Sequence, residues 1–247
     1  MLSRKLIKYI QSLSHKKFRD TDNVFIAEGP KIILEFLTSK TFECELICAL
    51  PQWINNIDKD LLDDIEVHEV DDLMLNRLSA LATPNKVLAV FKKRFTDVAP
   101  DLDGRLTLML DDIKDPGNFG SIIRIADWFG LKNVICSSGS VDCYNPKVVQ
   151  GSMGSLTRVS VIYTDLPLFI RQNSHLKLYA ATLTGTSIYN LNGIREGILI
   201  IGNESFGVNS SILELATDQI SIPRSGQAES LNAAVATGII LSHLGVR

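Results

Sequence analysis

Two short apolar segments constrain the fold of this chain more than any other feature. Residues Leu106–Leu110 and Gly197–Ile201 are almost entirely apolar, and a polar segment that contains glycine follows each of them directly. A strand that is apolar at successive positions must be buried on both faces, which is typical of a parallel sheet covered by helices on both sides. Candidate strands and helices alternate along the rest of the chain, so the pattern predicts an α/β fold with a mostly parallel sheet.

A polar segment divides this alternating pattern into two parts. Residues 96–105 contain Pro100 and Gly104 among charged side chains, as expected of a linker. We therefore predict a smaller N-terminal α/β domain over residues 1–95 and a larger domain over residues 106–247. With 247 residues, the chain is long enough to form two cores.

Helical spacing of apolar residues predicts several helices. Four of them are expected at residues 3–18, Ser121–Phe129, Pro146–Leu156 and Asn232–Leu244. The last of these is apolar on nearly every face, so we expect it to be buried.

Charge is distributed unevenly along the chain. The formal net charge of −3 gives no general case for nucleic-acid binding, but residues 1–19 contain six Lys or Arg and no acid. Such a basic arm could dock a phosphate backbone, although a solvated amphipathic helix is the simpler interpretation. The candidate RNA-binding residues of this arm are Arg4, Lys5, Lys16, Lys17 and Arg19.

Neither a membrane segment nor a metal site is predicted. No apolar run approaches the roughly 18 residues of a membrane helix, and charges occupy the positions where a signal peptide would be apolar. We therefore expect a cytoplasmic protein whose four cysteines are reduced. Cys44 and Cys48 are spaced as C-x3-C, but no second pair of Cys or His lies near them to complete a zinc site.

Three polar loops are expected at the carboxyl edge of the sheet, where α/β proteins bind ligands. They read DDIKDPGNFGS after the strand that ends at Leu110, GNESFG after the strand that ends at Ile201, and PRSGQAESLN before the last helix. None contains the glycine pattern of a dinucleotide-binding or P-loop protein. Ser230 and Asn232 are expected to cap the last helix.

Arg124 follows the first loop among apolar neighbours and needs a partner. An ion pair with Asp127, three residues on, is one explanation. The other is a contact with a phosphate or a ribose hydroxyl, for which the planar donor fork of arginine is suited.

Taken together, the three loops resemble the three motifs of the SpoU/TrmH-type RNA 2′-O-ribose methyltransferases of the SPOUT superfamily. The first motif, D-x-x-x-D-P-x-N-x-G-x-x-x-R, runs from Asp111 to Arg124; G-x-E-x-x-G begins at Gly202; and I-P-x-x-G-x-x-x-S-L-N begins at Ile222. The resemblance covers about residues 105–247. It extends more weakly to Asn23–Lys31, which resembles the start of the family's small RNA-binding domain, itself similar to ribosomal proteins.

The resemblance implies a fold and partners that residue patterns alone do not give. The C-terminal domain should be a parallel sheet with a deep trefoil knot, a topology that chain-connection rules would not suggest. It should bind S-adenosylmethionine, release S-adenosylhomocysteine and form a homodimer with the active site near the subunit interface. The cofactor-binding residues implied are Thr182, Leu183, Gly185, Gly202, Asn203, Gly207, Ile222 and Leu231.

The implied reaction is transfer of a methyl group to a ribose 2′-hydroxyl of RNA, with ribosomal RNA favoured over transfer RNA. The implied catalytic residues are Arg124, Asn118, Glu204, Ser230 and Asn232. Arginine is effectively always protonated, so we expect Arg124 to orient the phosphate and hydroxyl rather than to act as a base. Methylation of transfer RNA, a non-catalytic RNA-binding protein of the same fold, and a doubly wound enzyme for another nucleotide are the alternatives.

Overall fold

The computed structural model describes residues 2–81, 83–94, 100, 102–191 and 193–244. It divides into two compact units, the first formed by Met1–Phe95 with Asp142–Thr157 and the second by Thr96–Val141 with Arg158–Arg247. Within the predicted linker, residues 96–99 and 101 lie outside the described residues. The division gives the first unit a segment, residues 142–157, that is distant from its other residues in the sequence.

The first unit is a four-stranded sheet with helices on both faces. Its elements in chain order are α1 (Arg4–Ser12), α2 (Lys16–Asp22), β1 (Val24–Glu28), α3 (Pro30–Ser39), β2 (Cys44–Ala49), α4 (Pro51–Asn56), η1 (Lys59–Leu62), β3 (Glu66–Glu69), α5 (Asp72–Leu78), β4 (Val87–Lys92), α7 (Pro146–Ser152) and η2 (Ser155–Thr157). The strand order is β1-β4-β2-β3. Strand β4 is antiparallel to both of its neighbours, so this sheet is mixed rather than mostly parallel.

Two cores lie on the two faces of this sheet. On one face, α1 and α5 pack Ile7, Ile10 and Leu75 against the sheet residues Val24 and Leu88. On the other face, aromatic rings form the core: Phe25 of β1 lies 5.6 Å from Phe36, 5.4 Å from Phe42 and 5.8 Å from Phe91, measured between ring centroids. The helix predicted over 3–18 is interrupted at Leu13, and its second part begins again at Lys16.

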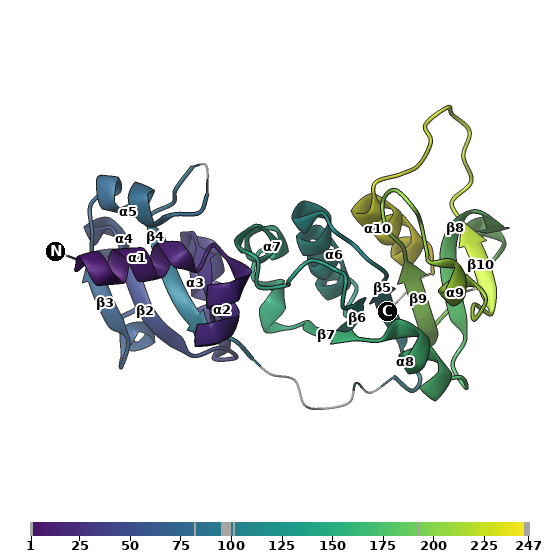
Figure 1. The fold of residues 1–247 in the computed structure, drawn as a ribbon, viewed down its shortest axis with the longest axis horizontal. Helices are drawn as coiled ribbons and strands as arrows, with labels where there is room; N and C mark the ends of the chain where they lie inside the picture. The colour runs from purple at the N-terminus through teal and green to yellow at the C-terminus, as the bar shows by residue number, and fades with distance from the viewer. Residues whose placement is uncertain (1, 82, 95–99, 101, 192, 245–247) are drawn as a thin grey trace. The chain divides into compact units, whose positions relative to one another are not determined.

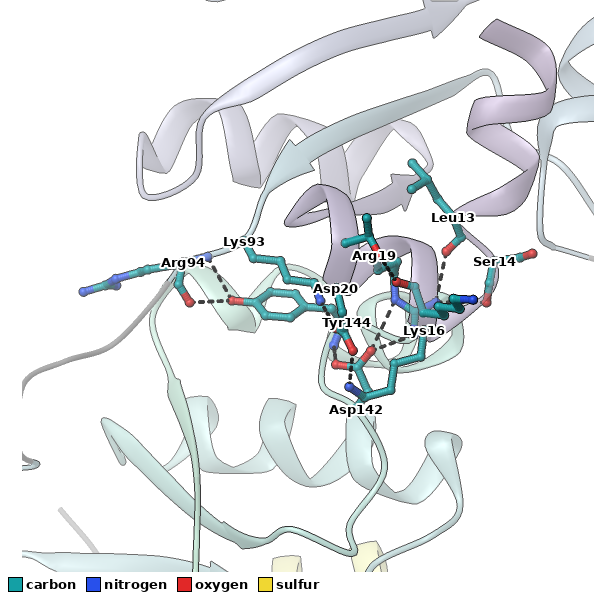
Figure 2. Close-up of polar contacts among 11 residues, drawn as sticks. Leu13, Ser14, Lys16, Arg19, Asp20, Lys93, Arg94, Asp142 and Tyr144 are labelled. Atoms are coloured by element: carbon teal, nitrogen blue, oxygen red, sulfur yellow. Dashed lines mark hydrogen bonds and ion pairs between the residues drawn. The ribbon is translucent and has the colours of Figure 1, made fainter. Parts of the chain in front are cut away.

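The segment from Asp142 to Thr157 completes the aromatic core of the first unit. The ring of Tyr144 lies 4.7 Å from that of Phe25, and the Tyr144 hydroxyl donates to the main-chain oxygen of Arg94 at 3.1 Å. Burial is the main cause that raises the pKa of Tyr144 above its usual range. Figure 2 shows Tyr144 between Lys93, Arg94 and the ion pair of Arg19 with Asp142.

Arg19 is buried in this ion pair, which corrects its assignment as an RNA-binding residue. Its side chain is 2% exposed, and Nη2 lies 2.6 Å from Asp142 Oδ2. The guanidinium also donates to the main-chain oxygens of Leu13 and Ser14, at 3.0 and 2.9 Å (Figure 2). A buried guanidinium with these partners cannot reach a phosphate. Its positive charge instead stabilises the first unit through Asp142 and the two main-chain oxygens.

The rest of the predicted basic arm is exposed. Arg4 and Lys5 lie on the solvent face of α1, and Lys16 and Lys17 on α2. Lys16 is paired with Asp20 at 2.5 Å, and Asp20 also contacts Lys93 at 2.5 Å. If the remaining charges bind RNA, the affinity should fall as salt concentration rises.

The second unit is built on a six-stranded sheet in which every pair of neighbouring strands is parallel. Its elements in chain order are β5 (Leu106–Leu110), α6 (Pro116–Trp128), β6 (Asn133–Ser137), β7 (Ser160–Thr164), α8 (Leu166–Gln172), β8 (Leu178–Ser187), η3 (Ile188–Asn190), β9 (Gly197–Ile201), α9 (Ser210–Leu213), β10 (Asp218–Ser221) and α10 (Ala233–Leu244). The strand order is β10-β8-β9-β5-β6-β7. The two continuous apolar segments of the sequence are the central strands β5 and β9, as the parallel-sheet prediction requires.

Helices cover both faces of this sheet (Figure 1). Leu166 and Ile170 of α8 and Ile212 of α9 pack with alternate strand residues such as Met109 and Ile200. Helices α6 and α10 pack against each other, with Ile125 Cδ1 placed 3.7 Å from where a side chain on Gly238 would begin. The α10 helix is only partly buried, contrary to the prediction, because it presents Val235, half exposed, to solvent.

The cysteines are not linked to one another in the structure. All four cysteines are free thiols, and burial raises the pKa of Cys44 and of Cys48 to about 12. Within the residues that the structure describes, no group of His, Cys, Asp and Glu could hold a metal ion. No helix of the same residues is both long and apolar enough to cross a membrane.

Candidate active site

The polar loops after β5 and β9 meet beyond the carboxyl ends of these two neighbouring strands. Because β5 and β9 pair in register from Leu106–Gly197 to Leu110–Ile201, the residues that come next, Asp111 and Gly202, leave the sheet side by side. The main-chain N–H of Asp111 continues the ladder with a bond of 2.9 Å to the oxygen of Ile201. The parallel arrangement therefore brings together two segments about 90 residues apart in sequence.

Helix α6 begins five residues earlier than predicted, inside the first loop. Asp115 caps it by accepting a hydrogen bond from the N–H of Asn118 at 2.7 Å, and Pro116 occupies the first turn. Proline is favoured at this position because the N–H that it lacks would be unpaired there. Consequently Gly117, Asn118 and Gly120 belong to the first turns of a helix rather than to a loop.

The second loop is a tight hairpin held by Asn203. Asn203 and Gly207 exchange main-chain hydrogen bonds of 2.9 and 2.8 Å, and the Asn203 side-chain oxygen accepts from the N–H groups of Ser205 and Phe206. Its side-chain nitrogen donates to the oxygen of Asp112 at 2.8 Å. The side-chain oxygen and nitrogen of Asn203 thus hold the shape of the two loops.

Asp111 ties the far end of the second loop to the first. Its carboxylate is buried and accepts a hydrogen bond of 2.8 Å from the N–H of Asn209. Burial is the main cause of the raised pKa of Asp111; the bond from Asn209 opposes the shift, and the charge of Asp112 adds to it. Asn203 and Asp111 therefore both join the second loop to the first.

One residue from each motif joins a hydrogen-bonded chain in the described structure. The side-chain nitrogen of Asn118 donates to Glu204 Oε1 at 2.8 Å, and its oxygen accepts from the side-chain nitrogen of Asn232 at 2.6 Å. Asn232 also caps α10 by accepting from the N–H groups of Ala234 and Val235. Asn118 lies between the other two residues and orients Oε1 of the Glu204 carboxylate.

Arg124 lies apart from this chain of residues. It is exposed on α6, and six residues of helix separate it from Asn118, which is a rotation of about 240° around the axis. Asp127, the alternative partner, is instead bound by Arg158, whose Nε lies 3.1 and 2.9 Å from its two carboxylate oxygens. None of the hydrogen bonds or ion pairs found among the described residues involves the Arg124 side chain.

The third loop is open, and only its last residue joins the others. Residues 223–232 are exposed and extend away from the sheet between β10 and α10 (Figure 1). Ser230 makes no side-chain hydrogen bond within the described part of the chain, so Asn232 alone of the two predicted caps serves α10. Leu231 is 48% exposed, and Ile222, just past β10, is half-buried.

The predicted cofactor residues of β8 lie beside β10, in the stretch where the pairing of these two parallel strands changes register. A side chain on Gly185 would begin 2.4 Å from the main-chain carbon of Gln219, and Ser221 Oγ donates to the Gly185 oxygen at 2.6 Å. Thr182 Oγ1 is buried without a hydrogen-bond partner, and Leu183 is 71% exposed. Thr182 thus offers an unpartnered polar atom and Leu183 an exposed apolar side chain.

Replacing Gly202 by alanine is expected to disrupt the hairpin. The added carbon would lie 2.1 Å from the main-chain carbon of Gly207, too close for any rotamer to relieve. We expect a loss of about 1–3 kcal/mol in the free energy of unfolding, the usual cost of overpacking, measured by urea denaturation. Gly226→Ala is the matched control, because nothing lies within 4 Å of its added carbon. Equal stability of the two variants would contradict the close approach.

Comparison with known families gives two matches along the chain. Residues 105–242 match the SpoU rRNA Methylase family, and residues 4–89 match the MRM3-like substrate binding domain. The chain is 31% identical to the 23S rRNA (guanosine(2553)-2′-O)-methyltransferase RlmP of Bacillus subtilis, over 96% of this chain and 95% of the relative.

Solved structures agree with these matches over nearly the whole chain. An AdoMet-bound rRNA methyltransferase from Sinorhizobium meliloti is 28% identical and superimposes with a TM-score of 0.86, covering 99% of this chain and 95% of that one. The SpoU methyltransferase AviRb from Streptomyces viridochromogenes, in complex with AdoMet, is 25% identical with a TM-score of 0.84, over 98% and 97% of the two chains. With its three motifs on this fold and a family match over more than half of its length, the chain belongs to the SpoU rRNA methylase family.

Proposed function

We propose that this protein transfers a methyl group from S-adenosylmethionine to the 2′-hydroxyl of a ribose in ribosomal RNA. The observation that carries the proposal is the hydrogen-bonded chain of Asn118, Glu204 and Asn232, one residue from each family motif, at the carboxyl edge of the sheet. Relatives named as 23S rRNA methyltransferases support ribosomal over transfer RNA. A non-catalytic RNA-binding protein would not need the three motifs to meet.

The residues around β8 and the second loop fit S-adenosylmethionine. The unpartnered hydroxyl of Thr182 and the exposed side chains of Leu183 and Leu231 offer polar and apolar contacts to an adenosine group. The main chain at Gly185, Gly202, Gly207 and Ile222 would complete the site. When bound, the cofactor supplies a methyl group that is already activated by its sulfonium, so the protein has to position the acceptor oxygen and help remove its proton.

Each polar residue then has a role toward the RNA. Arg124 orients the phosphate and the 2′-hydroxyl of the target nucleotide, since its permanent charge suits an anion and not a proton. Glu204, held by Asn118 through one oxygen, accepts a hydrogen bond from the target nucleotide through the other. Ser230 orders the third loop around the bound substrates, and Asn232 keeps this loop attached to Asn118.

A trefoil knot and a homodimer belong to the same proposal. The main chain of Gln219 leaves no room for a side-chain carbon on Gly185, and the pairing of β10 shifts register between Gln219 and Ile220; both support a tight chain crossing as in a knot. Trp128 is 85% exposed on α6, one turn after Arg124, and an exposed tryptophan of this size supports a subunit interface at that face. In such a dimer Arg124 would lie at the interface, which accounts for its separation from Asn118.

We place the enzyme in the cytoplasm, together with the RNA on which it acts. Support comes from the four free thiols, three of which are buried, since cytosolic proteins keep their cysteines reduced.

The test is methyl transfer from radiolabelled S-adenosylmethionine to unmodified ribosomal and transfer RNA. Label in alkali-resistant dinucleotides of ribosomal RNA is the expected result, because 2′-O-methylation blocks cleavage at that ribose. Label in transfer RNA alone would move the substrate to the alternative class. No label in either RNA or in precursor ribosomal particles, with cofactor binding intact, would overturn the proposal.

A further inference from the structure

Phe206 is the most exposed large apolar residue in the described part of the chain. It is 91% exposed and lies in the turn of the second-loop hairpin, which follows β9. Single exposed apolar side chains are common on protein surfaces, so exposure alone assigns no role to this ring. Two further observations do: the way the hairpin holds Phe206, and its place beside the candidate active site.

The main chain of Phe206 is held in one conformation. Its N–H donates to Asn203 Oδ1 at 3.2 Å, and the N–H of Ser205 donates to the same oxygen at 2.9 Å. The next residue, Gly207, exchanges main-chain hydrogen bonds with Asn203 and has a φ of 72°, which residues with a side chain rarely adopt. A firmly held turn therefore presents the ring, and a bound partner has little more than its two side-chain torsions to restrict.

The ring is close to the residues that we propose bind the target nucleotide. Phe206 follows Glu204 by two residues, so their Cα atoms are at most about 7 Å apart. Glu204 Oε1 accepts a hydrogen bond from Asn118 at 2.8 Å, and the side chain of Asn203 donates to the oxygen of Asp112 at 2.8 Å. Two side chains thus attach the hairpin to the first motif, and Phe206 keeps its position relative to the Glu204 carboxylate.

The composition of the hairpin indicates which part of an RNA it can contact. Residues 202–207 read GNESFG and contain one carboxylate and no Lys, Arg or His. A phosphate would be repelled by Glu204 and would find no cation in this turn, whereas a nucleobase offers an apolar face to an aromatic ring. Proteins commonly stack unpaired RNA bases on aromatic side chains, because the faces of a paired base are covered inside the helix.

We propose that Phe206 stacks on an unpaired base of the substrate RNA at the methylation site and so positions the ribose that accepts the methyl group. The proposal rests on the proposed function and adds the class of acceptor to it: a ribose in a loop or bulge of ribosomal RNA rather than in a double helix. The role of Phe206 is to bind the base, since its ring has no group that could accept the proton of the hydroxyl.

Substitutions of Phe206 test the proposal through methyl transfer to unmodified ribosomal RNA. Stacking of one base strengthens binding by about 5- to 100-fold, so Phe206→Ala should raise KM for RNA by that factor while kcat and the affinity for S-adenosylmethionine change little. Phe206→Leu keeps an apolar side chain without an aromatic ring and should lose nearly as much, whereas Phe206→Tyr should keep the KM of the unaltered protein. Leu168→Ala, at an exposed leucine of α8 outside the three motifs, is the matched control. All four variants should melt at the temperature of the unaltered protein, because these exposed side chains have little packing to lose.

A second measurement does not depend on methyl transfer. Phe206→Trp in a Trp128→Phe background places a fluorescent ring in the turn, with the buried Trp53 as the other tryptophan of the chain. Ribosomal RNA should quench the fluorescence of this variant, because stacking brings a base against the ring. Leu168→Trp in the same background is the control and should not be quenched.

The outcomes separate the stacking from the proposed reaction. Quenching by ribosomal RNA without methyl transfer to any RNA would overturn the reaction and leave the stacking. Methyl transfer with an unchanged KM in Phe206→Ala would overturn the stacking and leave the reaction. Full activity of Phe206→Leu, with an altered sedimentation coefficient of Phe206→Ala, would show that the ring contacts a second copy of the chain instead. An equal loss of affinity for S-adenosylmethionine would place the ring on the cofactor.

The class of acceptor has its own test. Once the labelled ribose has been mapped, a complementary DNA strand annealed over it should abolish transfer, because the base is then stacked inside a duplex. The same DNA strand annealed elsewhere on the RNA through a matching sequence tag is the control. Undiminished transfer to the annealed site would contradict an unpaired base.

Discussion

Arg124→Ala is expected to lower methyl transfer by about 100-fold or more while leaving the affinity for S-adenosylmethionine within a few-fold. The side chain is exposed on α6 and has no hydrogen bond or ion pair among the described residues, so its removal should cost the fold little. A misplaced acceptor group alone can cost about 100-fold in rate. Single-turnover transfer from radiolabelled cofactor, with RNA in excess, measures the step directly.

Two further variants show whether the effect belongs to Arg124. Arg124→Lys keeps the charge but loses the planar donor fork, so we expect it to recover only part of the rate. Arg158→Ala breaks the ion pair with Asp127 on the same helix and tests whether a disturbed α6 is sufficient to lower the rate. If Arg124→Ala retains more than a tenth of the activity, the assignment of this residue is wrong.

Asp142→Ala should destabilise the first unit by about 3–5 kcal/mol, the usual cost of leaving one member of a buried ion pair without the other. The Arg19 side chain is 2% exposed and that of Asp142 10%, so water cannot replace the lost carboxylate without opening the unit (Figure 2). Unfolding in guanidinium chloride, followed through the buried Trp53 of α4, reports on this unit. A Trp128→Phe background removes the signal of the exposed tryptophan in the second unit.

A double variant separates the charge from the packing. Replacing both partners by apolar residues, Arg19→Met with Asp142→Leu, should recover most of the lost stability, because no buried charge then remains. Lys16→Ala is the control for an exposed pair, expected within about 1 kcal/mol of the unaltered protein. A loss below about 1 kcal/mol for Asp142→Ala would show that the pair is solvated in solution.

The sequence predicts most of the second unit because its signals are local. The strands at Leu106–Leu110 and Gly197–Ile201 have the predicted bounds, since continuous burial leaves a continuous apolar pattern. The predicted start of α6 is wrong because Gly117 and Gly120 favour a loop by propensity. The cap at Asp115 and the proline after it are the signals that indicate the correct boundary.

What could not be predicted depends on contacts between distant parts of the chain. Nothing local distinguishes Arg19 from the other cations of its arm; its burial results from Asp142, 123 residues later. In the same way, the roles of Asn203 and Asp111 in joining two loops depend on the pairing of β5 with β9. The three family motifs show which residues belong together, and only the folded chain shows that Asn118 is the one between Glu204 and Asn232.

The origin of the first unit from two separate stretches of chain has a consequence for its synthesis. Its core reaches completion only after Tyr144 and the residues up to Thr157 have been made, about 60 residues after its last strand. At roughly 5–20 residues per second, a ribosome needs about 3–12 s to add them. During that time, Phe25 of the nascent chain lacks its ring contact with Tyr144, and Arg19 lacks its ion pair with Asp142. The N-terminal unit therefore completes its core only after the first part of the second unit and residues 142–157 have been synthesised.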